Sequence, residues 1–571
     1  MARASKCLLL VALALAVAAA HAAAGIDAAA DIDETITMRT LSAVKAVKSV
    51  KGTKGYRQLP GGVPNLLDPR QNPGMLRVKS YDSRDAPTLA ALAADDSLTR
   101  ISPASSSAAA PVPVPPSFFG LSLDLNEVEG VAADDYIELV KGLAAHDNGP
   151  MIMRVGAYQA DRMVTPWNVS VYFALNKLHR ATGTKFIVGV NQHAEDVAVT
   201  QAQVRRNEQL LPKGSVLSYS VGNEPDMYSL QAANGLPGSD LPKPANWLGL
   251  NWVGVSRRIY KAAFDAAWGK KILSGPDWSD SHLTTGTLLW WLRSTRTFLN
   301  QITVHYYGGD ILKDTKIAQL LDDERITKKV ANVRELVRTG KEQGGLPLRI
   351  TEVATISYGG IQGLSDTAGA AIWALDVGLE LAYAGASGIN YHQVLSRHGN
   401  ANYNAISYDA VAGTIHARLP YYGYLMLQQS LAGGADILGR SISPSGCKAW
   451  LLRGRKDGSL RAVVINKNGD GKECAADIVL SEDEIAKHAD CAEAEYMYAP
   501  GGIDERWRLF YSNWYFGEVG SKKLRDRMAA PVFRYKSAAG QGGGFTAHLT
   551  KGTVAALVTI PLAAAPAAPA L

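Results

Sequence analysis

Two glutamates, Glu224 and Glu352, each lie at the end of a β-rich segment. Glu224 belongs to the string Val-Gly-Asn-Glu-Pro over residues 221–225, and Glu352 ends Leu-Arg-Ile-Thr-Glu over 348–352. Two carboxyls that face each other across a sugar can cleave a glycosidic bond. One, protonated, helps the leaving oxygen depart, and the other, ionised, attacks the anomeric carbon. The pattern therefore predicts a retaining glycosidase in which Glu224 is the acid/base and Glu352 is the nucleophile.

The residues around Glu224 favour this role. Pro225 disfavours helical backbone at the residue before it, so the sequence predicts an extended Glu224 whose side chain lies at the mouth of a barrel. An acid that acts near neutral pH also needs a raised pKa. Asn223 is placed to bind the 2-hydroxyl of the sugar, an interaction that strengthens in the transition state.

A later segment supplies candidates that would keep the nucleophile ionised. Tyr307 ends a predicted strand and is a candidate to donate a hydrogen bond to Glu352, which would lower the pKa of that carboxyl. His305 lies two residues earlier, and residues two apart on a strand share a face. Both residues are therefore predicted to line the site that holds the glutamates.

Alternating strand-like and helix-like segments after Ser117 predict the fold that brings these residues together. The candidate strands are Phe118–Leu125, Met151–Gly156, Lys185–Asn191, Val216–Gly222, Ile272–Ser274, Ile302–Tyr307, Leu348–Glu352 and Gly388–Val394. Helix-like segments between them include Ser170–Thr182, Asn251–Trp268, Ile326–Gly344 and Asp366–Ala384. Eight strands with intervening helices indicate the α/β class, with a (β/α)8 TIM barrel over residues 111–427. Such a barrel collects the C-terminal ends of its strands, and with them both glutamates, at one face.

The pattern changes after about Gln428. Short β-rich segments with glycine-containing connections follow: Ala449–Arg453, Leu460–Asn466, Asp477–Leu480, Phe545–Leu549 and Val554–Ile560. These segments predict a C-terminal β-sandwich domain over residues 428–562, followed by a tail over 563–571.

The first 110 residues differ from the rest of the 571-residue chain. Residues 1–24 combine a basic start, an apolar run and small residues suited to cleavage, a pattern that predicts a secretory signal peptide. A membrane anchor is the alternative, but the apolar run is short for a segment that spans a bilayer. Residues 25–110 predict a low-complexity leader or propeptide. These 110 residues carry four of the six net positive charges, so the remainder is near neutral, which argues against a nucleic-acid partner. No later stretch is apolar enough to span a bilayer, and we expect a secreted, extracellular protein, with a lysosomal, vacuolar or cell-wall location as the alternatives.

The cysteines and one sequon fit that expectation. Cys447, Cys474 and Cys491 remain after removal of the signal, so at most one disulfide forms among them and one thiol is left over. Asn168 opens the single N-glycosylation sequon of the chain.

No pattern predicts a cofactor or a metal. The cysteine spacing matches no zinc site, and the chain has no glycine-rich phosphate loop. Three histidines are isolated, as histidines of a polar lining or a core usually are: His193, His282 and His392.

From about Ser117 to Leu562 the chain resembles glycoside hydrolase family 79, the family of heparanases and related β-glucuronidases. Three strings carry the resemblance: Ser117–Gly120 in the first strand, Arg154–Gly156 in the second and Val304–Tyr307 in the sixth. The resemblance implies that Asp124 contacts the sugar, because members carry an acidic residue there. Ala157 departs from the family, which has a second glycine at that position.

The string Tyr358-Gly359-Gly360 is the most telling part of the resemblance. In heparanase-like members, the backbone N–H groups of such a glycine pair bind the carboxylate of a uronate, and glycines leave their amides unobstructed. Tyr403 lies near the position where the family places a carboxylate-binding tyrosine. The alternative for this string is an ordinary flexible loop.

Together these features predict a retaining glycosidase that cleaves β-linked glucuronic acid, with a uronate-containing oligosaccharide or polysaccharide, such as a proteoglycan-type glycan, as its partner. One alternative is a retaining glycosidase of the same barrel clan that acts on neutral sugars, which needs no carboxylate-binding loop. The other is a non-catalytic glycan-binding barrel. The presence of both glutamates together with Asn223 argues against that alternative.

Overall fold

The computed structural model describes residues 97–103, 110–228, 250–279, 284–311, 313–396, 399–409, 414–468, 471–511, 530–533, 535–536 and 543–563. The described residues all fall in one compact unit of the chain. The predicted signal peptide, nearly all of the predicted leader, His282 and all but the first residue of the predicted tail lie outside the described residues.

Eight parallel strands close into a barrel, in the order β10-β3-β4-β5-β6-β7-β8-β9. Their bounds are β3 Gly120–Asp124, β4 Ile152–Gly156, β5 Lys185–Val190, β6 Val216–Val221, β7 Leu273–Trp278, β8 Leu299–Gly309, β9 Leu348–Ile356 and β10 Gly388–Gln393. Every residue of β9 and of β10 is buried, as expected of strands that are covered on both faces. The predicted α/β class and (β/α)8 barrel are confirmed.

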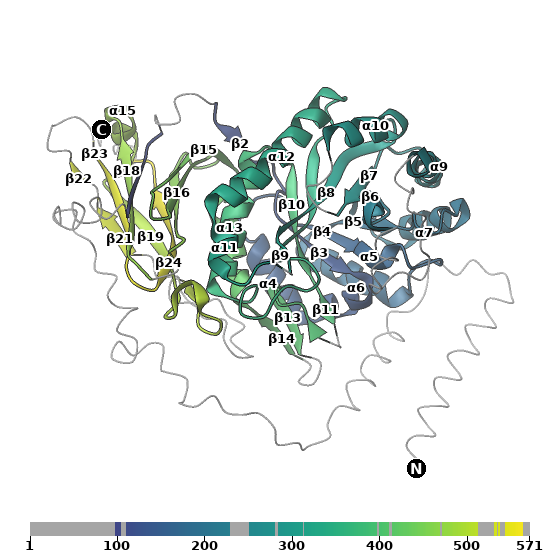
Figure 1. Ribbon diagram of the computed structural model, residues 1–571, viewed down its shortest axis with the longest axis horizontal. Coiled ribbons are helices and arrows are strands. Elements are labelled where there is room, and N and C mark those ends of the chain that lie inside the picture. The colour runs from purple at the N-terminus through teal and green to yellow at the C-terminus, as the bar shows by residue number, and fades with distance from the viewer. Residues whose placement is uncertain are drawn as a thin grey trace, which may run out of the picture. The chain divides into compact units, whose positions relative to one another are not determined.

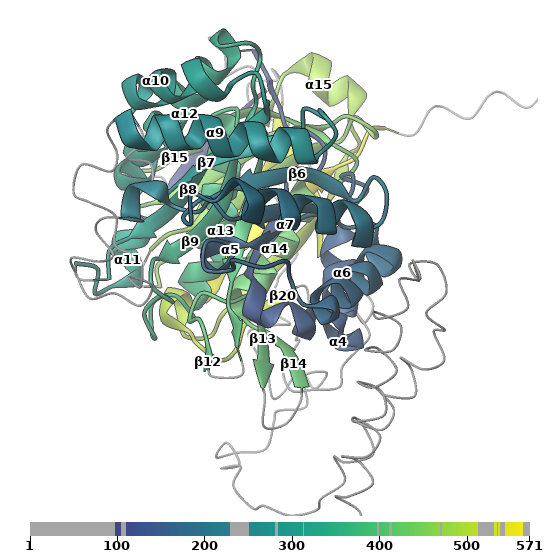
Figure 2. The same ribbon diagram turned by 90° about the vertical axis from the view of Figure 1, so that its right-hand side faces the viewer.

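Helices surround the barrel (Figure 1). The longer ones are α4 Asp134–Ala144, α6 Val169–Thr182, α7 Val197–Leu210, α9 Leu250–Ala266, α10 Thr285–Thr295, α12 Asp323–Glu342, α13 Ala368–Tyr383 and α14 Leu419–Ser430. Figure 2 shows α9, α10 and α12 along one side of β7 and β8. Short elements complete this part of the chain: η1 Leu125–Ala132, α5 Ala157–Ala160, η2 Pro225–Met227, α11 Ile317–Leu321 and the hairpin strands β11 Leu395–Ser396, β12 Gly399–Asn400, β13 Ile406–Asp409 and β14 Thr414–Ala417.

Local chemistry sets the ends of these helices. Asn168 caps α6, because its exposed side chain accepts a hydrogen bond from the backbone N–H of Ser170 at 3.1 Å. Gly183 ends the same helix in the left-handed conformation, with φ 71°, which glycine adopts without a steric penalty. The side chain of Asp196 caps α7 in the same way as Asn168. Asn168 thus has a structural role, and its glycosylation stays a prediction.

A β-sandwich follows the barrel. One sheet has the order β1-β18-β23-β22 and the other β2-β15-β16-β17-β24-β19-β20, with β21 also paired to β19. The bounds are β1 Leu98–Ile101, β2 Val112–Pro113, β15 Ala435–Ile442, β16 Cys447–Gly454, β17 Leu460–Asn466, β18 Cys474–Leu480, β19 Cys491–Tyr498, β20 Phe510–Tyr511, β21 Ala530–Phe533, β22 Tyr535–Lys536, β23 Gly543–Leu549 and β24 Thr553–Ile560; helix α15 Glu482–Lys487 and turn η3 Gly502–Asp504 connect them. Apolar side chains from both sheets form one buried core, so the predicted sandwich is confirmed.

The two predicted boundaries at the N-terminal end are wrong. Residues 98–101, which composition assigned to the leader, form β1 and pair in parallel with β18. Residues 112–113, which were expected to begin the barrel, form β2 and pair with β15 of the sandwich. Strands this short carry no readable periodicity, and only pairing with partners more than 300 residues away defines them. Pro113 is tolerated because β2 lies at a sheet edge.

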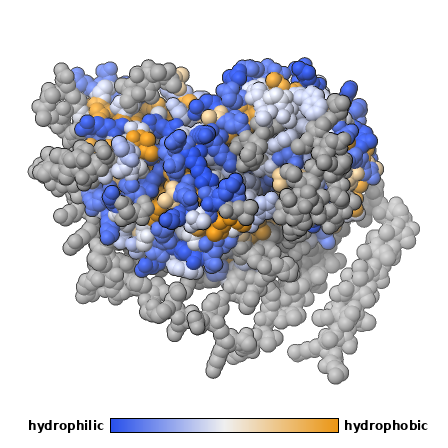
Figure 3. All heavy atoms as spheres, viewed as in Figure 1, coloured by the Kyte–Doolittle hydropathy of each residue, from blue (hydrophilic) through white to orange (hydrophobic). Residues whose placement is uncertain are grey.

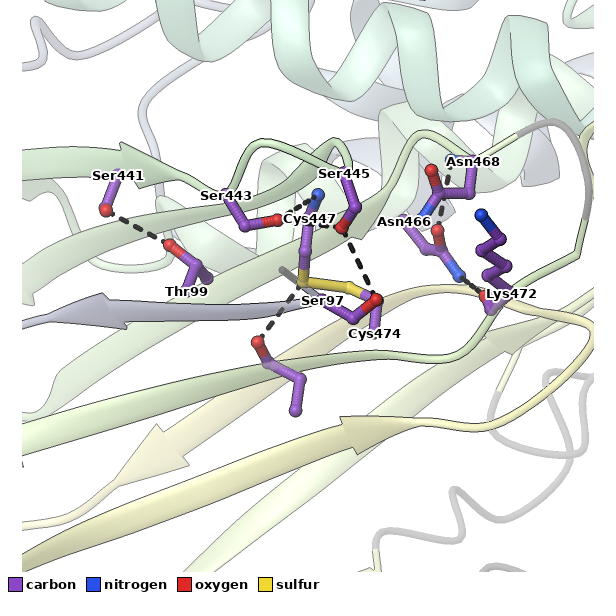
Figure 4. Close-up of a disulfide and its surroundings, with 11 residues drawn as sticks. Ser97, Thr99, Ser441, Ser443, Ser445, Cys447, Asn466, Asn468, Lys472 and Cys474 are labelled. Atoms are coloured by element: carbon purple, nitrogen blue, oxygen red, sulfur yellow. Dashed lines mark hydrogen bonds between the residues drawn. A yellow bond between two sulfur atoms is a disulfide. The ribbon is translucent and has the colours of Figure 1, made fainter. Parts of the chain in front are cut away.

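One disulfide joins the two sheets of the sandwich (Figure 4). Cys447 of β16 bonds to Cys474 of β18, with a Cα–Cα distance of 5.6 Å. Cys491 is a free, exposed thiol. Serines from two segments, Ser97 before β1 and Ser443 and Ser445 between β15 and β16, lie near the bond in Figure 4. The single disulfide and the leftover thiol agree with the cysteine count.

A buried group of charges attaches the sandwich to barrel helices α12 and α13, beside which β15 and β16 lie in Figure 1. Three cations of the sandwich meet three carboxylates of the barrel: Lys448, Lys467 and Arg440 face Asp323, Asp376 and Glu380. Lys448 is fully buried, and its Nζ lies 2.6 Å from Asp323 and 2.7 Å from Glu380. Removing one partner would leave a buried charge unpaired, at a cost of about 3–5 kcal/mol. The sandwich is therefore fixed firmly against the barrel.

Within the described part of the chain, no helix has both the length and the apolar character needed to cross a membrane. On the face shown in Figure 3, the coloured residues are largely hydrophilic, with separate hydrophobic patches between them.

Candidate active site

Glu224 lies just beyond the C-terminal end of β6, with its backbone in the left-handed region at φ 49° and ψ 57°. The predicted extended conformation is wrong. Pro225 does disfavour the right-handed helical region at Glu224, but the residue adopts the left-handed region, where its N–H donates to the backbone oxygen of Asp277 at 2.8 Å. Such backbone costs on the order of 1–3 kcal/mol and persists only where surrounding contacts impose it.

The Glu224 side chain contacts His305 on β8. Glu224 Oε1 lies 2.8 Å from His305 Nδ1, and the glutamate side chain is 19% exposed. Burial raises the pKa of Glu224 to about 7, although the hydrogen bond and the charge of His305 oppose that rise. The pKa of His305 is also raised, because the carboxylates of Glu352 and Glu224 outweigh the effect of its burial. The pair therefore holds a proton up to near-neutral pH.

Glu352 lies on β9 and is 4% exposed. Its Oε1 accepts a hydrogen bond from Arg154 Nη1 at 2.5 Å, and its Oε2 accepts one from the hydroxyl of Tyr307 at 2.5 Å. Burial favours the neutral acid, but the charges of His305, His392 and Arg154 and the hydroxyl of Tyr307 together hold the pKa of Glu352 well below its usual range. The two glutamates thus have pKa values displaced in opposite directions, as an acid and a nucleophile require.

Arg154 links three residues of the site. This residue of β4 is 1% exposed, and besides Glu352 it donates to Asn223 Oδ1 at 2.6 Å and to Asp277 Oδ2 at 2.9 Å. Sequence reasoning did not identify Arg154 as a site residue. A signal was present: an arginine inside an apolar barrel strand must be paired, because an unpaired buried charge is very costly.

Asp277, at the end of β7, is the second residue that sequence reasoning missed. Its side chain is fully buried and accepts hydrogen bonds from Arg154, from Ser220 and, at 2.6 Å, from Thr351 Oγ1. Burial favours the neutral acid, but the charges of Arg154 and His305 and the hydrogen bonds from Ser220 and Thr303 together lower the pKa of Asp277. Asp277 therefore anchors Arg154 through its carboxylate and the backbone of Glu224 through its carbonyl.

The two glutamates face each other. One carboxylate oxygen of Glu224, one of Glu352 and a ring nitrogen of His305 all lie within 4.8 Å of one another. Three such atoms can in principle ligate a metal. Here Arg154 and Tyr307 already occupy both oxygens of Glu352, so the arrangement is better suited to proton transfer and nucleophilic attack.

Asp124 and His392 lie at the ends of neighbouring strands β3 and β10, near Glu352. The Oδ1 atom of Asp124 is buried and has no hydrogen-bond partner in the described structure. Burial raises the pKa of Asp124, whereas the charge of His392 lowers it. His392 lies 3.3 Å from Ser122 Oγ and is 6% exposed, so it lines the site, one of the two roles that the sequence favours. Asp124 offers an unused acceptor for a hydroxyl group.

The loop that contains Tyr358, Gly359 and Gly360 follows β9, with all three residues at positive φ. The prediction of two free amides fails for Gly360, because its N–H donates to Ser357 O at 3.2 Å in a tight turn. The N–H of Gly359 has no partner in the described structure, and a Cβ placed there would meet no atom within 4 Å. Tyr358 is 60% exposed at the rim.

Tyr403 lies against this loop and near Tyr307, the residue that donates to Glu352. A Cβ on Gly360 would come within 3.1 Å of its ring, and its ring centroid is 5.9 Å from that of His392. Tyr403 packs in a small cluster with Ala354 and Tyr307. The structure therefore brings the predicted carboxylate-binding tyrosine to the wall that holds Glu352.

The chain is similar to known glycosidases. It is 26% identical over 277 residues, 45% of its own length and 48% of the relative's, to a protein of Aspergillus niger (strain ATCC MYA-4892 / CBS 513.88 / FGSC A1513) named "Beta-glucuronidase". The match thus spans about half of that relative. No protein-family model matches the chain.

Solved structures share the fold. A 4-O-α-L-rhamnosyl-β-D-glucuronidase from Fusarium oxysporum 12S, solved as a Rha-GlcA complex, superimposes with a TM-score of 0.63 at 17% identity, over 79% of this chain and 97% of that one. A family 51 α-L-arabinofuranosidase from Bifidobacterium longum gives a TM-score of 0.56 at 14% identity, with the same coverage of each chain. At these identities the likeness extends to the fold, a barrel architecture shared with glycoside hydrolases.

Proposed function

We propose that this protein is a retaining glycosidase that hydrolyses β-glucuronides. The observation that carries the mechanism is the approach of the two carboxylates, one oxygen of each lying within 4.8 Å. Retaining enzymes hold their carboxyls about 5–5.5 Å apart, whereas inverting enzymes need about 6.5–9.5 Å to admit a water. The similarity to proteins named as β-glucuronidases supports the substrate class.

The residues divide the reaction between them. In the first step the ionised Oε2 of Glu352 attacks the anomeric carbon, and protonated Glu224 gives its proton to the leaving oxygen. In the second step Glu224 takes a proton from water, which displaces the Glu352 carboxylate from the sugar. Tyr307 stays protonated, because burial and the Glu352 carboxylate raise its pKa well above the ordinary value, and it holds Oε2 in place until attack.

The preference for a uronate rests on local donors. The described loop leaves the Gly359 N–H available, and the Tyr403 ring lies beside the loop. A carboxylate that enters a partly dry pocket needs such donors, because its loss of hydration otherwise cancels the gain. A screen of aryl β-glucuronide against β-glucoside, β-xyloside and α-arabinofuranoside tests the proposal. A preference for any neutral glycoside would contradict it and favour the neutral-sugar alternative.

Tyr403→Phe is expected to lower kcat/KM on an aryl β-glucuronide by about 10- to 100-fold, because a hydrogen bond to a charged group contributes roughly 1.5–3 kcal/mol. Activity on the matching β-glucoside should change far less, since that sugar lacks the carboxylate. Tyr496→Phe, in β19 of the sandwich, is the matched control and should leave both substrates unchanged. Equal losses of kcat/KM on both substrates in Tyr403→Phe would show that the Tyr403 hydroxyl does not bind the carboxylate of the substrate.

The pH dependence follows from the opposite pKa shifts of the glutamates. Because the raised pKa of Glu224 lies at about 7, the protonated acid is lost as pH rises through that value, and kcat/KM should then fall about tenfold per pH unit. The lowered pKa of Glu352 keeps the nucleophile ionised throughout the acidic range, so no acidic limb should appear where ordinary glutamates titrate. The basic limb belongs to the coupled Glu224–His305 pair rather than to one group. A pH–rate profile that declines on the acidic side instead would reverse the assigned roles.

We further propose that the protein is secreted after cleavage near residue 24. The Cys447–Cys474 disulfide supports this, because such bonds persist in oxidising compartments. N-terminal sequencing of protein recovered from culture medium tests it, and retention of the full chain inside the cell would contradict it.

A further inference from the structure

A segment of the sandwich reaches the loop that follows β9. The carbonyl of Glu505 accepts the backbone N–H of Ala368, the first residue of α13, at 2.8 Å. Arg506 donates to Asp366 Oδ2 through Nη2 at 2.6 Å and through Nε at 3.2 Å. Asp366 in turn accepts the N–H of Gly363, within the same loop as Gly359. The C-terminal domain thus contributes side chains beside the loop proposed to bind the uronate.

A second arginine joins this contact from the barrel. Arg418, the residue before α14, lies with its Nη2 3.7 Å from Asp366 and donates through Nη1 to the backbone oxygen of Ala401 at 2.9 Å. Ala401 packs in the same cluster as Tyr403 and Tyr307, the residue that binds the nucleophile. Arg418 is therefore linked through Ala401 to the cluster beside Glu352, and Arg506 is linked to Arg418 through Asp366.

The charges at this point do not balance. Two guanidinium groups, 26% and 27% exposed, share the single carboxylate of Asp366, which is 6% exposed. Burial lowers the pKa of Arg418. The charge of Asp366 raises it, and the charge of the neighbouring Arg506 lowers it further. No hydrogen bond occupies Arg418 Nε and Nη2 or Arg506 Nη1 among the described residues. The pair can therefore offer several N–H donors and an uncompensated positive charge to an incoming anion.

An exposed aromatic ring lies next to these cations. Trp507 is 66% exposed, and the guanidinium of Arg506 lies 5.1 Å from its ring centroid. An indole combines a large apolar face with a polar N–H, which suits it to a binding surface that is partly in contact with water. Arg508, one residue further, is instead held by Glu505 at 3.2 Å and is 57% exposed.

We propose that Arg418 and Arg506 bind an oxyanion, a carboxylate or a sulfate, on a second sugar of the glycan, and that the Trp507 ring packs against that sugar. This inference rests on the proposed function, because it places the second sugar beside the pocket for the terminal glucuronate. The site would make the enzyme prefer acidic oligosaccharides over simple glucuronides. The sandwich would then be a part of substrate recognition as well as a support for the barrel.

The test compares Arg506→Gln and Trp507→Ala with Arg508→Gln as the matched control. The substrates are an aryl β-glucuronide and three glucuronyl disaccharides whose second sugar carries a carboxylate, a sulfate or neither group. For Arg506→Gln we expect KM on the acidic disaccharides to rise about 5- to 20-fold with kcat nearly unchanged, as expected for loss of a charge-assisted hydrogen bond at a partly exposed site. The difference should shrink at high salt, which screens exposed charges. The response of the carboxylated and sulfated substrates shows which oxyanion the pair prefers.

Several outcomes would overturn the inference. Equal losses on the aryl glucuronide and the acidic disaccharides would show that Arg506 merely supports the loop. Unchanged kinetics in both variants, or an equal effect in Arg508→Gln, would show that no such site exists. If Arg506→Gln lowers thermal stability enough to prevent assay, the kinetics of Trp507→Ala decide, because that change keeps both Arg506 hydrogen bonds to Asp366 available. Direct binding of the acidic disaccharide to Glu352→Gln enzyme, with and without Arg506→Gln, separates failure of this site from failure of the proposed glucuronidase activity.

Discussion

Glu352→Gln is expected to abolish turnover of β-glucuronides, with a loss in kcat of about 10⁴-fold or more, as when a covalent nucleophile is removed from other hydrolases. The amide of glutamine has nearly the shape of the carboxylate, so packing on β9 should persist. It cannot attack the anomeric carbon, and it carries no charge to pair with Arg154 at 2.5 Å. The measurement is the initial rate on an aryl β-glucuronide with a good leaving group.

Two controls separate chemistry from folding in this variant. Glu335→Gln on α12, whose side chain is 54% exposed, should leave the rate unchanged. A mechanism-based uronate inhibitor should attach covalently to the wild-type enzyme at Glu352 and fail to label Glu352→Gln. Labelling at another carboxylate, or substantial residual turnover in a correctly folded variant, would show that Glu352 is not the nucleophile.

The barrel could be predicted because the sequence features that identify its strands and helices lie within each segment. A strand buried on both faces must be apolar along most of its length, so segments such as Lys185–Val190 stand out between amphipathic helices. The glutamates were predictable for a related reason. A carboxyl at the C-terminal end of a barrel strand lies at the face where such enzymes carry out their chemistry. Neither inference requires knowledge of which strands are neighbours.

The parts that sequence reasoning missed depend on contacts between distant segments. Asp277 of β7 lies near Arg154 of β4 only because both strands belong to one closed barrel, although the two residues are more than 120 positions apart in the sequence. In its left-handed conformation Glu224 donates its N–H to the carbonyl of Asp277, and nothing in the string Asn-Glu-Pro reveals that partner. Strand β1 could not be predicted from the sequence either, because only its pairing with β18 identifies its four residues as a strand. The hydrogen bond from the Gly360 N–H to Ser357 O forms only in the folded loop, so the sequence did not predict it.

Glu224→Ala is expected to slow the two chemical steps unequally. With an aryl β-glucuronide that has a good leaving group, departure needs little help from an acid, so the glycosyl-enzyme on Glu352 should still form. With a poor leaving group the rate should fall by about 10²- to 10⁴-fold, the usual contribution of general acid–base catalysis. Hydrolysis of the intermediate should stall in both cases, because no base remains to activate water.

Azide distinguishes this role from a structural one. Azide needs no base, so it should attack the anomeric carbon of the stalled intermediate, release the Glu352 carboxylate and restore turnover. The product should be the β-glucuronyl azide, since two successive displacements retain the configuration. The basic limb near pH 7 should also shift, because His305 then titrates without Glu224, the partner with which it shares the proton. Glu482→Ala on the exposed helix α15 should respond to neither test. An α-configured product, or an unaltered pH profile without rescue, would show that Glu224 is not the acid/base partner of Glu352.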